Sequence, residues 1–126
     1  MKLTNKEIAQ FWANKRCAQA YNEALKELME LNDKEPVKGV RLNHCTAMVF
    51  KIPHWYILKS YETYVAVIDR DTDTLYDCLR LVYGYTATSA QHISKFNHMY
   101  GAGKWGVTEL VTGRPIRKEI DEEIEI

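Results

Sequence analysis

This 126-residue sequence has few cysteines, no net charge and no long apolar run, and each of these features argues against a class of protein. The three cysteines, Cys17, Cys45 and Cys78, are widely spaced and form no C-x-x-C pair, so neither a disulfide framework nor a zinc knuckle is indicated. Seventeen Lys and Arg balance seventeen Asp and Glu, which leaves no overall field to attract nucleic acid or an anionic membrane. We therefore expect a protein of the reducing cytoplasm whose electrostatic interactions are local.

Membrane-spanning and repeated segments are also lacking. No run approaches the ~18 consecutive apolar residues of a membrane span. The first residues, MKLTNKEIAQFW, contain no apolar segment of signal-peptide length. With 46% hydrophobic residues, a chain of this size buries roughly two-thirds of its unfolded surface without staples. The sequence therefore predicts one soluble domain over residues 1–126, with no membrane partner.

Residues 1–35 are predicted to form a long amphipathic helix. Thr4 and Glu7 fit a capping box, in which each side chain accepts a hydrogen bond from the other residue's backbone N–H. Apolar residues then recur at helical spacing until Pro36, which ends the pattern because it has no N–H to donate. Asn14 interrupts any coiled-coil heptad. We favour packing of this apolar stripe on the protein's own sheet over its use as a partner-binding surface.

Period-two alternation of apolar residues predicts strands after this helix. Both registers of residues 60–69, SYETYVAVID, are apolar or aromatic, which is typical of a central strand covered on both faces. A polar turn follows at residues 70–73, and residues 75–83 return as the hairpin partner. The remaining expected strands are residues 40–52, 54–58 and 107–111.

A second helix is predicted over residues 88–100, where Thr88 and Gln91 form another capping box and Gly101 follows as a left-handed C-cap. The expected fold is therefore α+β. A long N-terminal amphipathic helix packs on a small antiparallel sheet of four to five strands, and the second short helix follows the central hairpin. The sheet and this helix together occupy residues 40–113, and the charged tail, residues 114–126, can become helical if its isoleucine edge is covered.

The spacing of the acidic, histidine and cysteine residues matches neither a metal site nor a catalytic site. Residues 69–80 imitate a calcium loop, but Thr74 stands where the turn needs Gly and Arg80 where a bidentate Glu is needed. A solvated hairpin tip is the better interpretation. The His and Cys residues include no pair at a recognised ligand spacing, and no nucleophile–base pair or paired carboxylates can be identified. We expect no metal, no cofactor and no enzymatic activity.

Aromatic and acidic residues are the better candidates for binding. Four aromatic residues cluster around one strand junction, and Trp105 lies in the glycine-rich loop GAGKWG. Tyr and Trp are favoured anchors for protein partners, and an acidic tail can contact a basic partner. The predicted partner contacts are Trp55, Tyr56, Tyr61, Tyr64, Trp105, Glu119, Asp121, Glu122 and Glu123.

The start of the second helix is a weaker candidate for anion binding. Its free backbone N–H groups and positive dipole end favour an anion, and hydroxyl, amide and imidazole groups gather there. The residues concerned are Ser89, Gln91, His92 and Lys95. Simple helix capping explains the same residues and is the interpretation we prefer.

Three motifs together resemble a family of small uncharacterised proteins of phages and other mobile elements. They are SYETYVAVID at residues 60–69, TLY at residues 74–76 and TATSAQHISKF at residues 86–96. In that family a strand hairpin precedes a "T-T/S-x-x-H-I-x-x-F" helix. The resemblance covers about forty of the 126 residues. It implies a genomic setting, in which small accessory proteins often act by binding.

The leading functional hypothesis is therefore a non-enzymatic protein that binds and inhibits or modulates a host protein or ribonucleoprotein complex, as anti-CRISPR proteins do. The alternative is a small nucleic-acid-binding or nucleotide-binding module. It would use the start of the second helix together with Lys51, Lys59 and Lys95. Exposed edge strands and the isoleucine-lined tail also make a homodimer a prediction to be tested.

Overall fold

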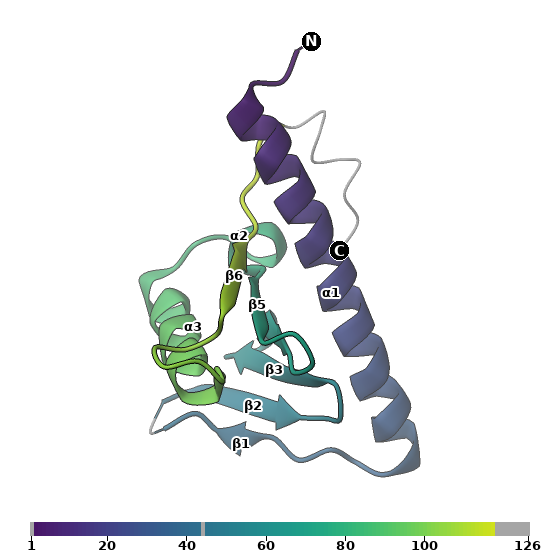
Figure 1. Ribbon diagram of the computed structural model, residues 1–126. Coiled ribbons are helices and arrows are strands. Elements are labelled where there is room, and N and C mark those ends of the chain that lie inside the picture. The colour runs from purple at the N-terminus through teal and green to yellow at the C-terminus, as the bar shows by residue number, and fades with distance from the viewer. Residues whose placement is uncertain (1, 44, 118–126) are drawn as a thin grey trace.

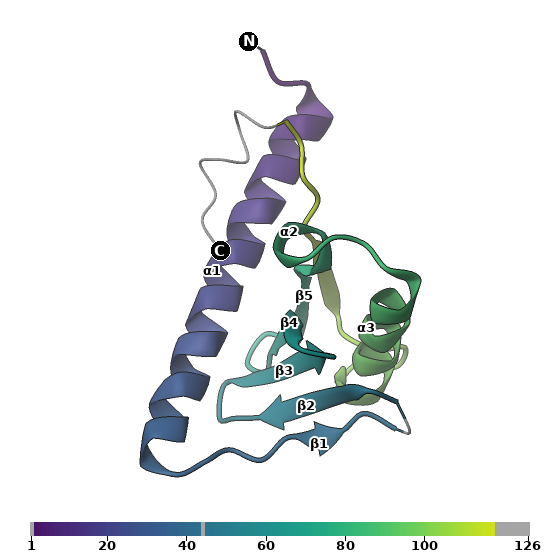
Figure 2. The ribbon, with the colours of Figure 1, turned by 180° about the vertical axis from the view of Figure 1, so that it is seen from behind.

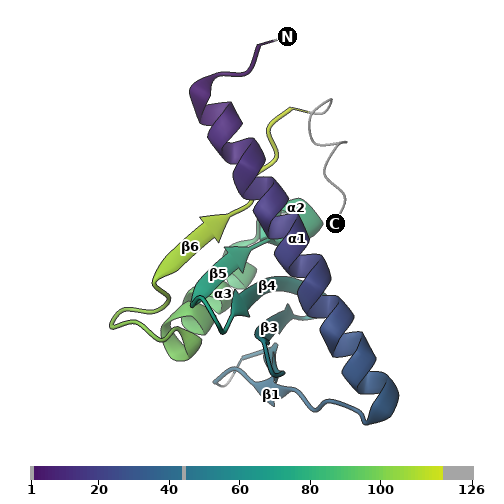
Figure 3. The ribbon, with the colours of Figure 1, turned by 45° about the vertical axis from the view of Figure 1, so that its right-hand side comes forward.

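Two helices cover opposite faces of one six-stranded sheet (Figures 1 and 3). The computed structural model describes residues 2–43 and 45–117. The strands follow one another across the sheet in chain order, from β1 to β6. The elements are α1 (Asn5–Lys34), β1 (Val40–Arg41), β2 (Ala47–Lys51), β3 (Trp55–Ser60), β4 (Thr63–Asp69), β5 (Thr74–Asp77), α2 (Leu79–Val82), α3 (Ala87–Tyr100) and β6 (Glu109–Thr112). The predicted α+β class is confirmed.

The long helix α1 forms as its sequence predicts. The Thr4 hydroxyl accepts from the Glu7 N–H at 3.1 Å, and the Glu7 carboxylate accepts from the Thr4 N–H at 3.0 Å, which confirms the capping box. The helix packs on the protein's own sheet through one stripe of residues. That stripe comprises Cys17, Ala20, Tyr21, Ala24 and Leu28. Hydrophobic burial of this stripe holds α1 in place.

Asn14 lies in that helix without interrupting its packing. Its side chain is fully buried. It donates to the Arg114 carbonyl at 2.7 Å and accepts from the Arg114 N–H at 2.9 Å. Figure 2 shows the chain after β6 running along the N-terminal half of α1. Asn14 thus satisfies its own polar atoms and fixes this return segment to the helix.

The sheet separates two apolar cores. Ile57 and Val67 face α1, whereas their neighbours Leu58, Ala66 and Ile68 face α3. This alternation follows from the period of two in an extended chain. Residues 65–68 of β4 are all buried, which confirms a central strand covered on both faces. Its predicted start was wrong, because Ser60 ends β3 and residues 61 and 62 form the turn between β3 and β4. The α3 face also holds Phe96, one of the largest fully buried side chains.

The sheet has six strands, so the expected four to five was too few. The predicted strand over residues 40–52 is in fact β1, a turn and β2. Asn43 has φ 56°, in the left-handed region that Asn tolerates, and this breaks the extended chain. Within β2, Ala47 and Val49 are buried on the α3 side of the sheet, whereas Phe50 packs on the α1 side.

The segment after the central hairpin differs as well. The predicted strand over residues 75–83 ends at Asp77, whose carboxylate accepts from the Leu79 N–H at 3.2 Å and helps to start α2. The N-cap of α3 is Thr86, whose hydroxyl accepts from the Ser89 N–H at 3.2 Å. Gly101 has φ −67° and is not a left-handed cap.

The sheet is not wholly antiparallel. Strand β6 pairs with β5 in parallel, because the chain crosses over one face of the sheet as α3 before it returns. A parallel neighbour requires such a crossover, whereas an antiparallel one needs only a tight turn. Helix α3 therefore separates two regions of the surface, the segment before its start and the loop after its end (Figure 1).

Candidate functional site

The loop after α3 presents Trp105 to solvent. The side chain is 80% exposed, more than any other large hydrophobic residue in the described part of the chain. Lys104 lies beside it, with its Nζ 5.4 Å from the centre of the indole. Met99, in the last turn of α3, is also more than half exposed. The sequence predicted a loop at GAGKWG but left open whether Trp105 is exposed or buried, and the structure shows it exposed.

Side chains from two other segments hold this loop. The Asp73 carboxylate accepts from the Ala102 N–H and from the Thr108 N–H, each at 2.9 Å. The Asn97 side chain accepts from the Val107 N–H at 2.8 Å. These bonds attach both ends of the loop to the β4–β5 turn and to α3. Trp105 is therefore displayed on a fixed support rather than on a loose one.

Two glycines make the tight path of the loop possible. A Cβ atom at Gly101 would lie 2.1 Å from the carbonyl carbon of Gly106, far inside any real contact. Gly106 itself has φ 129°, and a Cβ there would meet the Asn97 side chain at 2.5 Å. Close backbone approach therefore requires glycine at these two positions of the loop.

The four aromatic residues around the β3 junction do not form one surface. Trp55 is buried in the core beneath α1. Tyr56 packs against Tyr100 with ring centres 5.0 Å apart, and Tyr64 is half-buried. Only Tyr61 is exposed, at 55%. Of the predicted aromatic contacts, Tyr61 and Trp105 can meet a partner directly, and they lie at opposite ends of α3.

The start of α3 contains a buried polar chain that the sequence did not reveal. The Ser60 hydroxyl is 2.9 Å from the Ser89 hydroxyl and 2.8 Å from Nδ1 of His92. All three side chains are buried. Burial, and secondarily the charge of Lys95, lowers the pKa of His92 from its ordinary value. Lys95 and Gln91, the other residues predicted to bind an anion, are exposed.

A serine beside a histidine raises the question of nucleophilic catalysis. Such a pair normally needs a third group that orients the histidine and stabilises its charge. Among the residues that the structure describes, no carboxylate bonds to His92. The chain of hydrogen bonds therefore has a structural explanation, because it satisfies three buried polar groups and joins β3 to α3. The pair escaped sequence reasoning because Ser60 and His92 are far apart in the chain.

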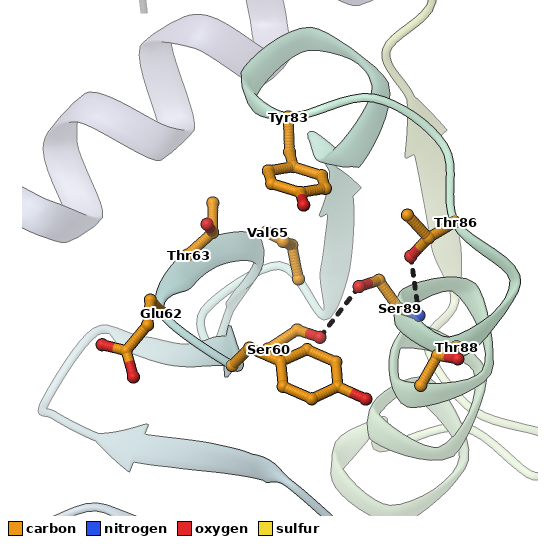
Figure 4. A pocket seen from close by; sticks show the side chains of 9 residues that line it. Ser60, Glu62, Thr63, Val65, Tyr83, Thr86, Thr88 and Ser89 are labelled. Carbon is orange, nitrogen blue, oxygen red and sulfur yellow. Dashed lines mark hydrogen bonds between the residues drawn. The ribbon is translucent and has the colours of Figure 1, made fainter.

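A pocket opens beside this polar chain (Figure 4). Its volume is about 400 Å³. It lies between the turn that joins β3 to β4 and the segment that joins α2 to α3. The lining residues are Ser60, Tyr61, Glu62, Thr63, Val65, Tyr83, Thr86, Thr88 and Ser89. Of these, only Tyr61 and Ser89 were predicted from the sequence as binding residues, and the density of hydroxyl groups at residues 83–89 was the available signal for several of the others.

The structure also bears on the predicted hairpin tip and shows where the predicted acidic contacts lie. The Asp69 carboxylate accepts from the Asp71 N–H at 2.9 Å, which confirms a hairpin tip that bonds its own backbone. Within residues 2–43 and 45–117, no three His, Cys, Asp or Glu residues are grouped to hold a metal ion. No helix in this part of the chain is long and apolar enough to cross a bilayer. The predicted acidic contacts Glu119, Asp121, Glu122 and Glu123 lie outside the described residues.

Comparison with protein-family models, with curated proteins and with solved structures finds no match to this chain. The resemblance of residues 60–96 to proteins of phages and mobile elements therefore stays a prediction.

Proposed function

We propose that this protein is a non-enzymatic binding protein that attaches to a macromolecular partner through Trp105. The observation that carries the proposal is the 80% exposure of an indole on a loop held by Asp73 and Asn97. The exposed ring contributes little to the protein's own core. A rigidly held loop with an outward tryptophan has a clear use when that tryptophan enters a pocket on another molecule.

The physical advantage of this arrangement is preorganisation. Tryptophan is enriched among the residues that dominate binding energy, because one large ring buries much apolar area. Ordering a loose loop on association reduces affinity, whereas a loop already fixed by hydrogen bonds avoids most of that loss. The bonds to Ala102, Thr108 and Val107 are made within the protein. The loop therefore loses its conformational entropy when the protein folds, and little more is lost when a partner binds.

The partner we propose is a host protein or ribonucleoprotein complex, which the protein inhibits or modulates by occupying a surface. The balanced charge of the chain favours an aromatic protein interface over direct binding of nucleic acid. The resemblance to phage and mobile-element proteins supports an anti-defence role of the anti-CRISPR type.

The alternative, a nucleotide-binding or nucleic-acid-binding module, has less support from the geometry. Ser89 and His92 bond to Ser60, so their side chains are already engaged. Lys51 and Lys59 each lie over a tyrosine ring of the protein. This function stays a prediction.

The test is a pull-down from host-cell lysate with the immobilised full chain, followed by titration of the purified captured protein. We expect Trp105→Ala to weaken binding at least about tenfold. Trp12→Ala is the matched control, because Trp12 is 60% exposed on α1 and its loss should leave affinity unchanged. Unchanged affinity in Trp105→Ala would contradict the proposed anchor. A steep fall of affinity with added salt would favour the nucleic-acid alternative.

A further inference from the structure

We propose that the pocket at the start of α3 binds a neutral, polyhydroxylated ligand of the size of one or two sugar rings. This site is separate from the Trp105 loop. The two lie at opposite ends of α3, a helix of 14 residues that spans about 20 Å. The inference does not rest on the proposed function, and either can hold without the other.

The size of the pocket suits a small ligand. Its volume of about 400 Å³ falls near the lower end of the ~300–1,000 Å³ found for ligand pockets. Val65 is buried beneath it, and the two tyrosines Tyr61 and Tyr83 stand at its sides, 55% and 67% exposed. In Figure 4 the Tyr83 hydroxyl points into the pocket, toward Ser60 and Ser89.

The lining is rich in hydroxyl groups and has one ionisable side chain, the carboxylate of Glu62. All of its residues except Glu62 and Val65 carry a hydroxyl, and a hydroxyl both donates and accepts hydrogen bonds. The hydroxyls of Ser60, Ser89 and Thr86 already bond within the protein, so those of the tyrosines and of Thr63 and Thr88 are the ones offered to a ligand. No Lys or Arg is among the lining residues, so the pocket offers no cation to a phosphate or a carboxylate. Figure 4 shows the Glu62 carboxylate turned away from Thr86 and Ser89. The one carboxylate of the lining is therefore not directed at these hydroxyl groups, and a cation bound beside them would not contact it.

The aromatic walls narrow the choice among neutral ligands. A sugar ring presents C–H groups on one face and hydroxyls around its edge. The C–H face packs on an aromatic ring, and the hydroxyls exchange hydrogen bonds with groups such as those of Tyr83 and Thr88. Tyr61 and Tyr83 supply exposed rings beside a hydroxyl-lined floor, which is the combination that such a ligand requires.

The wall formed by Tyr61 is fixed in an unusual conformation. Tyr61 has φ 54°, which is rare for a bulky residue. Its ring lies 5.8 Å from the ring of His92, and His92 is itself bonded to Ser60. Strained residues of this kind persist where the surrounding structure holds them, and they gather at ligand sites. The buried polar chain thus keeps the shape of the pocket.

The experiment titrates the ¹⁵N-labelled full chain with a panel of neutral monosaccharides and disaccharides, followed by NMR. We expect saturable shifts of the Tyr61, Thr88 and Ser89 amides with at least one sugar. Inorganic phosphate and guanidinium, tested in the same way, should not shift these amides. Tyr83→Ala should weaken the sugar at least about tenfold. Tyr85→Ala is the matched control, because Tyr85 is 58% exposed in the same segment and does not line the pocket.

Three results would overturn the inference. They are the absence of saturable shifts with every sugar, saturable shifts with phosphate or guanidinium instead, and equal loss of sugar affinity in Tyr83→Ala and Tyr85→Ala. Because both tyrosines are exposed, neither variant should unfold the protein, and the ¹⁵N spectrum of each verifies this directly. Binding of the macromolecular partner by Tyr83→Ala is measured separately and reports on the Trp105 surface alone.

Discussion

The Ser60 hydroxyl lies 2.8 Å from Nδ1 of His92, so a strand at the centre of the sheet and the helix on its outer face share one buried hydrogen bond. The same hydroxyl also contacts Ser89. These three side chains form the floor and the support of the pocket. Their burial makes the protonation of the imidazole costly, and this has a measurable consequence.

We predict that the free energy of unfolding falls on mild acidification because of His92. Burial lowers the pKa of this imidazole below its ordinary value of 6.5. Below about pH 6.5 the unfolded chain binds a proton at His92 more readily than the folded protein does. The contribution of neutral His92 to the free energy of unfolding is therefore complete above about pH 6.5 and is lost as the pH falls toward the folded pKa. Urea unfolding between about pH 5 and 8 measures the effect.

The control for this prediction is His92→Asn, whose side chain offers a donor and an acceptor but does not titrate. The variant should be less stable than the wild type at neutral pH, and the difference between the two should shrink as the pH falls. A constant difference across this range would show that His92 does not contribute to the pH dependence.

We predict that Asp73→Ala loosens the Trp105 loop while the rest of the protein stays folded. The variant loses the carboxylate that accepts from Ala102 and Thr108. Hydrogen exchange at these two amides should become much faster, and affinity for the captured partner should fall although Trp105 is intact. Asp71→Ala, at the exposed tip of the same turn, should change neither. Fast loop exchange with unchanged affinity would show that preorganisation does not contribute.

Replacement of Asn14 by Leu should destabilise the protein. Asn14 donates to and accepts from the backbone of Arg114, and Leu leaves both backbone groups without this partner. The expected loss is about 1–3 kcal/mol, the usual penalty of an unsatisfied buried group. Chemical unfolding measures it, and Gln19→Leu on the exposed side of α1 is the control. A loss below about 0.5 kcal/mol would mean that water replaces Asn14 without cost.

The three cysteines should differ in reactivity. Cys17 and Cys78 are fully buried, whereas Cys45 is partly exposed. A hydrogen bond with Cys17, and then burial, raise the pKa of the Cys78 thiol, which keeps it protonated and unreactive. A thiol reagent should therefore modify Cys45 alone in the folded protein and all three after denaturation. Rapid modification of Cys78 under native conditions would contradict the packing of α1 on the sheet.

Local features of this fold could be predicted from the sequence because their signals are local. The capping box of Thr4 and Glu7, the apolar stripe of α1 and the two-faced burial of β4 each depend on residues close together in the chain. The break between β1 and β2 was missed because the turn at Asn43 lies inside a continuous period-two pattern over residues 40–52.

The candidate sites could be predicted only in part, because long-range contacts build them. Trp105 was recognised from its glycine-rich surroundings, but nothing local connects its loop to Asp73. The pocket needs the β3–β4 turn beside the segment before α3. That arrangement depends on the packing of α3 on the sheet and on the hydrogen bond between Ser60 and His92, which are distant in the chain.

The parallel strand β6 also sets the order in which this chain can finish folding on the ribosome. Glu109 pairs with Arg16 through two hydrogen bonds, and Arg114 completes the partners of Asn14. The helix made first thus contacts residues made about a hundred positions later. Until those residues leave the exit tunnel, Asn14 bonds to water in place of Arg114, and chaperones can reach the apolar stripe of α1.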